Sequence, residues 1–260
     1  MEAYFKRIEE VPKEKILWNI PEQKQGSLTI IGGNSQMFRT SVKVAEFVTA
    51  NYPVKELRLV LPDALEKKLP PLDNATFLHS TDSGSFGSEE ELARVLGVAD
   101  FNLLIGDFSK NSVTGKAVAG AVKSSEKPLI ATRDTVDLLA ENQSEEWLMN
   151  ENVTLLASLT QLQKVFRSIY YPKMLLLTQS LVQVSEALHK FTLSYPIGII
   201  TLHDGQILVS RNGQVSVLPL EKSFYSPIML WMGEAAAKVA VLNMYNPGDF
   251  SDASLTALSR

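Results

Sequence analysis

Short apolar runs alternate with segments of helical spacing along most of this chain. Each run is four or five residues long, and several stop at Gly or Pro, as buried strands do. The segments between the runs repeat apolar residues every three or four positions. We predict strands at 27–31, 57–61, 101–105, 129–132 and 153–156, and helices at 42–52, 89–98, 115–124 and 136–141. This alternation is typical of an α/β fold with a mostly parallel sheet and helices on both faces.

The C-terminal third has a different pattern. Three short apolar segments, 197–202, 206–210 and 214–218, are joined by the hairpin dipeptides Asp204-Gly205 and Asn212-Gly213. A long helix is predicted after them, from residue 228 to about residue 245. We therefore expect an antiparallel hairpin edge near the C-terminus. Because no repeat or Gly/Ser linker is present, we predict a polar N-terminal arm, 1–25, followed by a single domain, 26–260.

Composition narrows the classes of partner. The chain has 260 residues, of which 45% are hydrophobic, so it can bury a full core. Its net charge of -4 disfavours nucleic acid or an anionic membrane as the main partner and leaves small molecules or proteins. It has no cysteine, which excludes disulfides and thiolate sites. No signal peptide or apolar stretch of about 20 residues is found, so a cytoplasmic location is expected.

Polar and glycine residues follow two of the predicted strands. In parallel sheets the carboxyl ends of the strands hold ligands, and a glycine turn before a helix can hold a phosphate. Helix capping explains the same residue types. Asn34 or Ser35 would cap the helix after strand 27–31, and Asp107 or Ser109 would cap the helix after strand 101–105. The candidate ligand-binding residues are Gly32, Gly33, Asn34, Ser35, Gly106, Asp107, Ser109 and Asn111.

The other polar residues do not form a recognisable catalytic or metal-binding motif. Asp134 and Asp137 stand three apart at a strand–helix junction, where capping explains them more readily than an acid–base pair does. The three histidines are far apart in sequence, so no metal site is predicted. Neither a P-loop nor a Gly-x-Ser-x-Gly elbow is present.

The order of these elements resembles the ribokinase-like family, in particular its branch of ATP- or ADP-dependent NAD(P)H-hydrate dehydratases and carbohydrate-kinase-like proteins. The resemblance rests on TIIGGNSQMFRTSVKVAEFV, VADFNLLIGDFSKNSVTG, KPLIATRDTVDLLAE and GIITLHDGQILVSRNGQVSVLP, in that order. It implies a three-layer ribokinase-like fold and a homo-oligomer. ATP or ADP with Mg²⁺ is implied as cofactor only if the family activity is retained.

This chain departs from the family at the motifs that supply the family's catalytic and phosphate-binding residues. The family opens its long C-terminal helix with Gly-x-Gly-Asp, whose aspartate is the catalytic base, but this chain reads KSFYSPIMLWMGEAAAK, with Pro227 near the expected aspartate. The family's Thr-Pro-His-x-x-Glu becomes LLASLTQLQKVF, with Leu162 near the glutamate, and its Lys-Gly becomes His203-Asp204. Asp107 replaces a proline or small residue, and a carboxylate there is expected to repel phosphate.

Three functional hypotheses follow. We favour a ribokinase-like pseudoenzyme that binds a small molecule or forms an oligomer. The alternative is an active nucleotide-dependent NAD(P)H-hydrate dehydratase or small-molecule kinase, with Asp134 or Glu234 as a relocated base. The third is a doubly wound domain without a family link that binds another ligand through Gly32 and Gly33. Isolated apolar residues of the arm, such as Ile16 and Trp18, need a covering surface, which favours a homo-oligomer.

Overall fold

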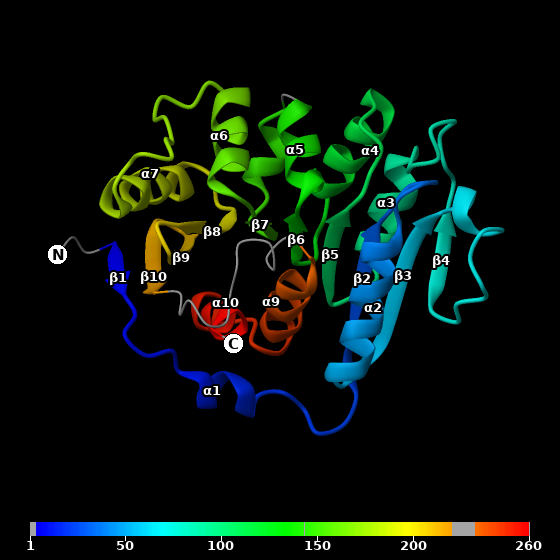
Figure 1. Ribbon diagram of the computed structural model, residues 1–260, viewed down its shortest axis with the longest axis horizontal. Coiled ribbons are helices and arrows are strands. Elements are labelled where there is room, and N and C mark those ends of the chain that lie inside the picture. The colour runs from blue at the N-terminus through cyan, green and yellow to red at the C-terminus, as the bar shows by residue number, and fades with distance from the viewer. Residues whose placement is uncertain (1–3, 143, 220–231, 260) are drawn as a thin grey trace.

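The computed structural model describes residues 4–142, 144–219 and 232–259, which form three layers with one sheet in the middle (Figure 1). Ten strands lie in the described part of the chain. They are β1 (Phe5–Arg7), β2 (Gln25–Gly32), β3 (Val54–Pro62), β4 (Ala75–Leu78), β5 (Phe101–Gly106), β6 (Leu129–Thr132), β7 (Val153–Leu156), β8 (Gly198–His203), β9 (Gln206–Arg211) and β10 (Gln214–Pro219).

Helices of 6 to 14 residues connect most of the strands. They are α1 (Lys13–Trp18), α2 (Arg39–Asn51), α3 (Glu89–Leu96), α4 (Ser112–Lys123), α5 (Asp134–Glu141), α6 (Leu159–Ser168), α7 (Leu181–Ser194), α9 (Glu234–Tyr245) and α10 (Phe250–Leu258), with short 3-10 turns at Asp63–Leu65 and Glu146–Met149. The predicted strands and the helices between them are confirmed. The strands β1 and β4 and the helices α1, α6, α7 and α10 were not predicted.

The strand order in the sheet is β1-β10-β9-β8-β7-β6-β5-β2-β3-β4. The strand β9 runs antiparallel to both of its neighbours, and the other pairings are parallel. The mostly parallel sheet and the antiparallel hairpins near the C-terminus are therefore confirmed. The chain proceeds from β2 to β3 on one side and later adds β5 on the other. Ligands of open α/β sheets bind where the order reverses in this way, outside the carboxyl ends of the strands.

The two hairpin turns have the backbone that their sequences predict. Asp204 and Gly205 have φ values of 49° and 67°, and Asn212 and Gly213 have values of 49° and 73°. Positive φ at both central residues is the property of a type I′ turn, which matches the twist of the flanking strands.

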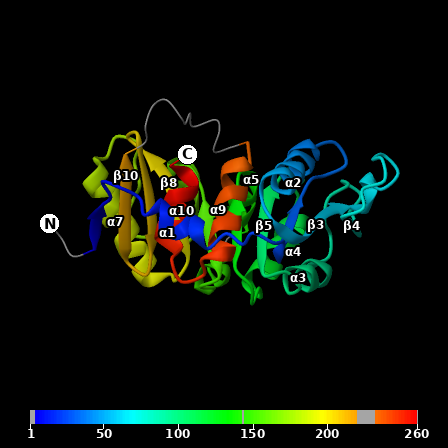
Figure 2. The same cartoon turned by 90° about the horizontal axis from the view of Figure 1, so that it is seen from below.

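Each face of the sheet has its own hydrophobic core. Side chains from α3, α4, α5, α6 and α7 form one buried cluster with the sheet, and those from α1, α2, α9 and α10 form the other. Figure 2 shows α1, α9 and α10 together on one side of the sheet. Helix α9 contacts β5, β6, α2 and α10, so its consecutive residues Val239, Ala240 and Val241 are all buried.

Helix α9 begins later than the sequence predicts. The expected start at residue 228 lies outside the described residues, but Met232 and Gly233 are described and are not helical. Gly233 has a φ of 90° and is the N-cap residue, so the first helical residue is Glu234. The left-handed backbone of this glycine ends any helical path from the preceding residues.

The N-terminal arm packs against the rest of its own chain. Phe5 in β1 pairs with Val215 in β10, which adds a parallel strand to the sheet. Ile16 in α1 is fully buried, whereas Trp18 is 88% exposed. Ile16 is therefore covered within the chain, whereas Trp18 is a large apolar side chain of the described part of the arm that stays exposed. In the part of the chain that the structure describes, no helix has the length and apolar character needed to cross a bilayer.

Candidate functional site

Three neighbouring strands, β6, β5 and β2, end at the carboxyl edge of the sheet. The backbone is left-handed directly after them, with φ values of 102° at Gly33, 91° at Gly106, 60° at Asp107 and 55° at Arg133. A residue other than glycine in such a strained conformation costs on the order of 1–3 kcal/mol. Strain of this kind clusters at functional sites, which makes this edge the candidate site.

The paired glycines join the ends of two strands closely. A Cβ atom at Gly32 would lie 2.5 Å from Cγ2 of Ile105, and one at Gly106 would lie 2.1 Å from Oδ1 of Asp134. The N–H of Gly33 donates to the carbonyl of Gly106 over 2.8 Å. Glycine is therefore required at 32 and 106 by close packing of the backbone, whether or not a ligand binds.

Asn34 links the turn after β2 to the exit of β5. Its Oδ1 accepts hydrogen bonds from the N–H groups of Gln36 and Met37, over 2.8 and 3.0 Å, and its Nδ2 donates to the carbonyl of Asp107 over 2.6 Å. Helix α2 begins only at Arg39, and its N-cap makes no side-chain hydrogen bond. The prediction that Asn34 or Ser35 caps this helix is therefore wrong, because Asn34 stabilises a turn that precedes it.

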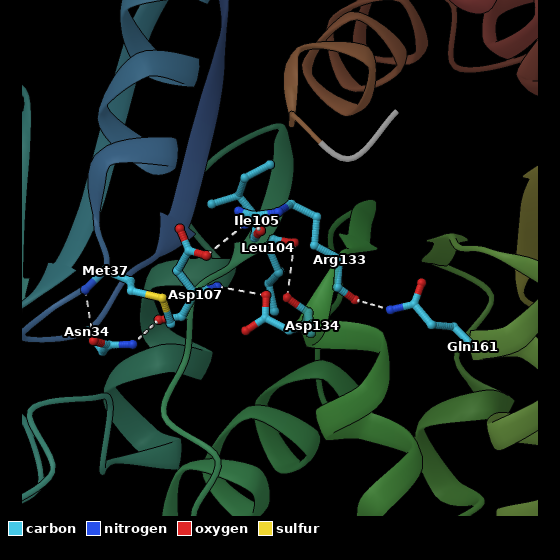
Figure 3. Close-up of polar contacts among 9 residues, drawn as sticks. Asn34, Met37, Leu104, Ile105, Asp107, Arg133, Asp134 and Gln161 are labelled. Atoms are coloured by element: carbon cyan, nitrogen blue, oxygen red, sulfur yellow. Dashed lines mark hydrogen bonds and ion pairs between the residues drawn. The ribbon is translucent and has the colours of Figure 1, made fainter. Parts of the chain in front are cut away.

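Asp107 and Arg133 form an ion pair at the centre of this edge (Figure 3). Nη2 of Arg133 lies 2.7 Å from Oδ1 of Asp107, and the side chains are 20% and 9% exposed. Nη1 of Arg133 also donates to the carbonyl of Ile105 over 3.3 Å. Asp107 is thus paired with a cation rather than presented as an isolated charge. Repulsion of phosphate was expected from an unpaired carboxylate at this position. Pairing with Arg133 reduces that repulsion.

Asp134 lies beside this ion pair. Its Oδ1 accepts a hydrogen bond from the N–H of Asp107 over 2.8 Å. Burial raises the pKa of the Asp134 carboxyl above its ordinary value, and the negative charge of Asp107 adds to this, while the hydrogen bond from the Asp107 N–H opposes it. The N-cap of α5 is Arg133, which makes no capping hydrogen bond, so the prediction that Asp134 caps this helix is wrong.

Gln161 from α6 holds the turn that carries Arg133. Its Nε2 donates to the carbonyl of Arg133 over 2.6 Å and to Oδ2 of Asp137 over 2.7 Å, and Asp137 also forms an ion pair with Lys164. Gln161 occupies this place because it completes a capping box with Ser158 at the start of α6. Sequence reasoning missed both Arg133 and Gln161, although Ser158-x-x-Gln161 before an apolar helix was a readable signal.

A cavity of about 580 Å³ lies between these side chains. Its walls come from the exits of β2, β5 and β6 and from the start of α6. The lining residues are Asn34, Met37, Asp107, Phe108, Ser109, Lys110, Arg133, Asp134 and Gln161. Of the predicted ligand-binding residues, the structure thus brings Asn34, Asp107 and Ser109 to one cavity.

The remaining predicted residues lie behind or beside the cavity. Gly32, Gly33 and Gly106 do not line it and lie where the ends of β2 and β5 meet, and the N–H of Ser35 donates to the carbonyl of Gly84 in a neighbouring loop. Asn111 is the N-cap of α4, and its side chain accepts from the N–H of Thr114. Neither Asp107 nor Ser109 caps α4, so that alternative is wrong.

The opening of α9 adds one more carboxylate to the region. A Cβ atom at Gly233 would lie 2.7 Å from Cδ1 of Ile105 and from Cγ2 of Val44, so α9 begins against the end of β5. Glu234, the next residue, is exposed and is not among the residues lining the cavity. Pro227, like the aromatic residues Phe224 and Tyr225, lies outside the described residues. Among the residues described, no three His, Asp or Glu side chains gather as a possible metal site.

Solved structures with a similar fold include a ribokinase-like superfamily protein and a kinase. A ribokinase-like superfamily protein of Enterococcus faecalis is 12% identical, with a TM-score of 0.66, and the match covers 100% of this chain and 86% of that one. Bacillus subtilis YxkO, a member of the UPF0031 family, is 13% identical, with a TM-score of 0.62 and coverages of 96% and 87%. The ADP complex of Bacillus subtilis pyridoxal kinase is 13% identical, with a TM-score of 0.52 and coverages of 90% and 89%.

These matches show that the fold is ribokinase-like, as the order of the sequence elements implied. A scan against protein-family models and a search of curated protein sequences give no match. At such low identity the likeness concerns the fold alone. The likeness agrees with the three-layer fold that the resemblance implies.

Proposed function

We propose that this protein binds a small anionic molecule at the carboxyl edge of its ribokinase-like sheet and does not catalyse the family's phosphoryl-transfer or dehydratase chemistry. One observation carries the proposal. Both carboxylates that line the cavity are committed to neighbours, since Asp107 is paired with Arg133 and Asp134 accepts the N–H of Asp107. A carboxylate held by its neighbours in this way has a structural role, which favours binding over general-base catalysis. The cavity is therefore arranged to bind a ligand rather than to move its protons.

The charges around the cavity support an anionic ligand. Asp107 and Arg133 compensate each other, and burial raises the pKa of Asp134 above its ordinary value. Lys110 lines the cavity, is exposed and forms no ion pair with any described residue. Lys110 thus supplies an unpaired positive charge, which would attract a phosphate or carboxylate group of the ligand.

Calorimetry with and without Mg²⁺ tests this proposal. Inorganic phosphate, ADP, ATP and NADH serve as probes, and release of inorganic phosphate from ATP is measured in parallel. We expect anion binding that does not need Mg²⁺, that K110Q weakens by about tenfold, and that is not accompanied by turnover. K116Q is the matched control, since Lys116 is exposed on α4 and does not line the cavity. Tight Mg²⁺-dependent nucleotide binding with turnover would overturn the proposal.

A second candidate function is an active nucleotide-dependent NAD(P)H-hydrate dehydratase or small-molecule kinase. The observation that favours it is the start of α9, where Gly233 is left-handed and Glu234 is the first helical residue. The family that the sequence resembles has a glycine and its catalytic aspartate at the opening of the long C-terminal helix. Glu234, rather than Pro227, then becomes the counterpart of that aspartate.

The two candidates differ in what substitution of Glu234 does. If the enzyme is active, E234Q lowers turnover by about 10²–10⁴, as removal of a general base does, and E234D retains part of it. E66Q is a control far from α9 in sequence. Absence of turnover in the wild-type protein with ATP or ADP, with either hydrated NADH or a set of hydroxylated small molecules as co-substrate, would exclude this second candidate.

A further inference from the structure

A second, smaller cavity lies at the opposite, amino-terminal edge of the sheet. The strands β5, β6 and β7 begin at this edge, and β9 ends there because it runs antiparallel to β8. The end of α9 and the start of α10 close it from one face. The volume is about 90 Å³, and the lining residues are Asp100, Phe101, Pro128, Asn152, Thr154, Arg211, Asn243, Met244, Pro247 and Phe250.

Arg211, the last residue of β9, is held in a fixed orientation in the wall of this cavity. Its guanidinium carbon lies 4.1 Å from the ring centre of Phe250. Its Nη2 donates to the carbonyl of Glu151 over 2.9 Å and contacts Oγ1 of Thr154 at 3.4 Å. Its Nε and Nη1 groups make no hydrogen bond to any described residue. The contact with the aromatic ring orients the guanidinium and leaves its Nε–H and Nη1–H groups, which lie on different edges, as free donors.

The charge of Arg211 has no ion-pair partner within the described part of the chain. Burial lowers the pKa of this guanidinium below its usual range, and the nearby charge of Glu151 opposes the shift. Asp100 also lines the cavity, but its Oδ2 already accepts from the N–H and the hydroxyl of Ser27, over 2.9 and 2.8 Å. A partly buried cation without a counter-ion is costly, so an anion in this cavity would be stabilised.

We propose that this cavity binds a small monocarboxylate of two or three carbon atoms through the edge of the Arg211 guanidinium. A volume of about 90 Å³ corresponds to roughly three water molecules at about 30 Å³ each, so the cavity suits a ligand of only a few non-hydrogen atoms. A carboxylate oxygen is a strong acceptor for either of the free N–H groups of Arg211. The carboxyl group of Asp100 in the same cavity disfavours a dianion such as hydrogen phosphate, and this selects a single negative charge.

The experiment uses the full-length protein and acetate as the probe. In nitrogen-15-labelled protein the Nε–H resonance of Arg211 is assigned by its absence in R211K and followed during titration with sodium acetate. Sodium chloride and sodium phosphate at equal ionic strength form the parallel arms. We expect a saturable shift with acetate at millimolar concentration and no saturable shift with the other two salts.

A thermal-unfolding series gives an independent readout. Acetate should raise the melting temperature of the wild type and of R94K, an exposed arginine on α3, but not that of R211K. The wild-type resonance decides the question even if R211K does not fold. Equal shifts with all three salts, or a resonance that acetate leaves unchanged, would show that the cavity holds only water and would overturn the proposal.

Discussion

The guanidinium of Arg133 lies 2.7 Å from the carboxylate of Asp107, and both residues have a left-handed backbone at the ends of adjacent strands. The contact therefore joins two strained turns across the carboxyl edge of β5 and β6. Gln161 holds the carbonyl of Arg133 from a third element, α6. Strained turns persist when their surroundings over-determine them, and this network of side chains does so here.

We expect the ion pair between Asp107 and Arg133 to contribute measurably to stability because both side chains are mostly buried. D107N retains a residue that tolerates the left-handed backbone but removes the charge, so the free energy of unfolding should fall by about 1–3 kcal/mol. Urea denaturation measures it. The control is E146Q, which removes the exposed pair of Glu146 with Lys123 and should change stability by less than about 0.5 kcal/mol. Equal effects of the two variants would contradict the prediction.

Gly106 is expected to tolerate no side chain. Its φ is 91°, and a Cβ atom would lie 2.1 Å from Oδ1 of Asp134. G106A combines backbone strain with a steric clash and should lower the free energy of unfolding by more than about 2 kcal/mol. Substitution of Gly205 distinguishes backbone strain from steric clash, because Gly205 has a φ of 67° but open space around it. G205A should cost only about 1 kcal/mol by urea denaturation, and a similar cost for both variants would show that the clash is relieved.

The layout of the fold followed from the sequence because strands and helices there have strong, separate periodicities. Residues 27–31 combine Leu28, Ile30 and Ile31 with two small polar residues, and they form most of the buried part of β2. Elements with a weaker sequence pattern were not predicted. The strand β1 has one partly buried residue in three and depends on pairing with β10 and on packing of Phe5 against the core.

The side chains of the candidate site were harder to predict than its position. The pattern located the exits of β2 and β5, but pairing of Arg133 with Asp107 depends on which strands are neighbours in the sheet. The same holds for Gln161, whose partner Arg133 is 28 residues away in the chain. Local capping rules assigned Asn34 and Asp134 to their own helices, whereas both side chains bind backbone groups of Asp107 across the sheet edge.

The buried carboxyl group of Asp134 predicts a pH dependence of stability. Burial raises its pKa in the folded state above the ordinary value of 3.8, so the folded protein binds this proton more tightly than the unfolded chain does. The stabilisation is complete below about pH 3.8 and is lost as the pH rises through the folded pKa. D134N keeps a neutral acceptor and does not titrate. Its stability relative to the wild type should therefore increase between about pH 4 and pH 7.

Urea denaturation at several pH values checks this difference. D73N is the control, since Asp73 is exposed and forms no hydrogen bond or ion pair with any described residue. Its stability relative to the wild type should stay constant over the same range. A constant difference for D134N as well would show that its carboxyl group has the same pKa in the folded and unfolded states.

The N-terminal arm offers a test that separates folding from assembly. Deletion of the first 20 residues would remove Ile16, which is fully buried against the core beneath the sheet, so loss of an oligomer in that variant would not identify an interface. I16A should lower the free energy of unfolding by about 2–4 kcal/mol. W18A removes a side chain that is 88% exposed and should change it by less than about 0.5 kcal/mol. If a second copy of the chain covers Trp18, light scattering will show a lower mass for W18A at unchanged stability. An unchanged mass would place any homo-oligomer contact elsewhere on the surface.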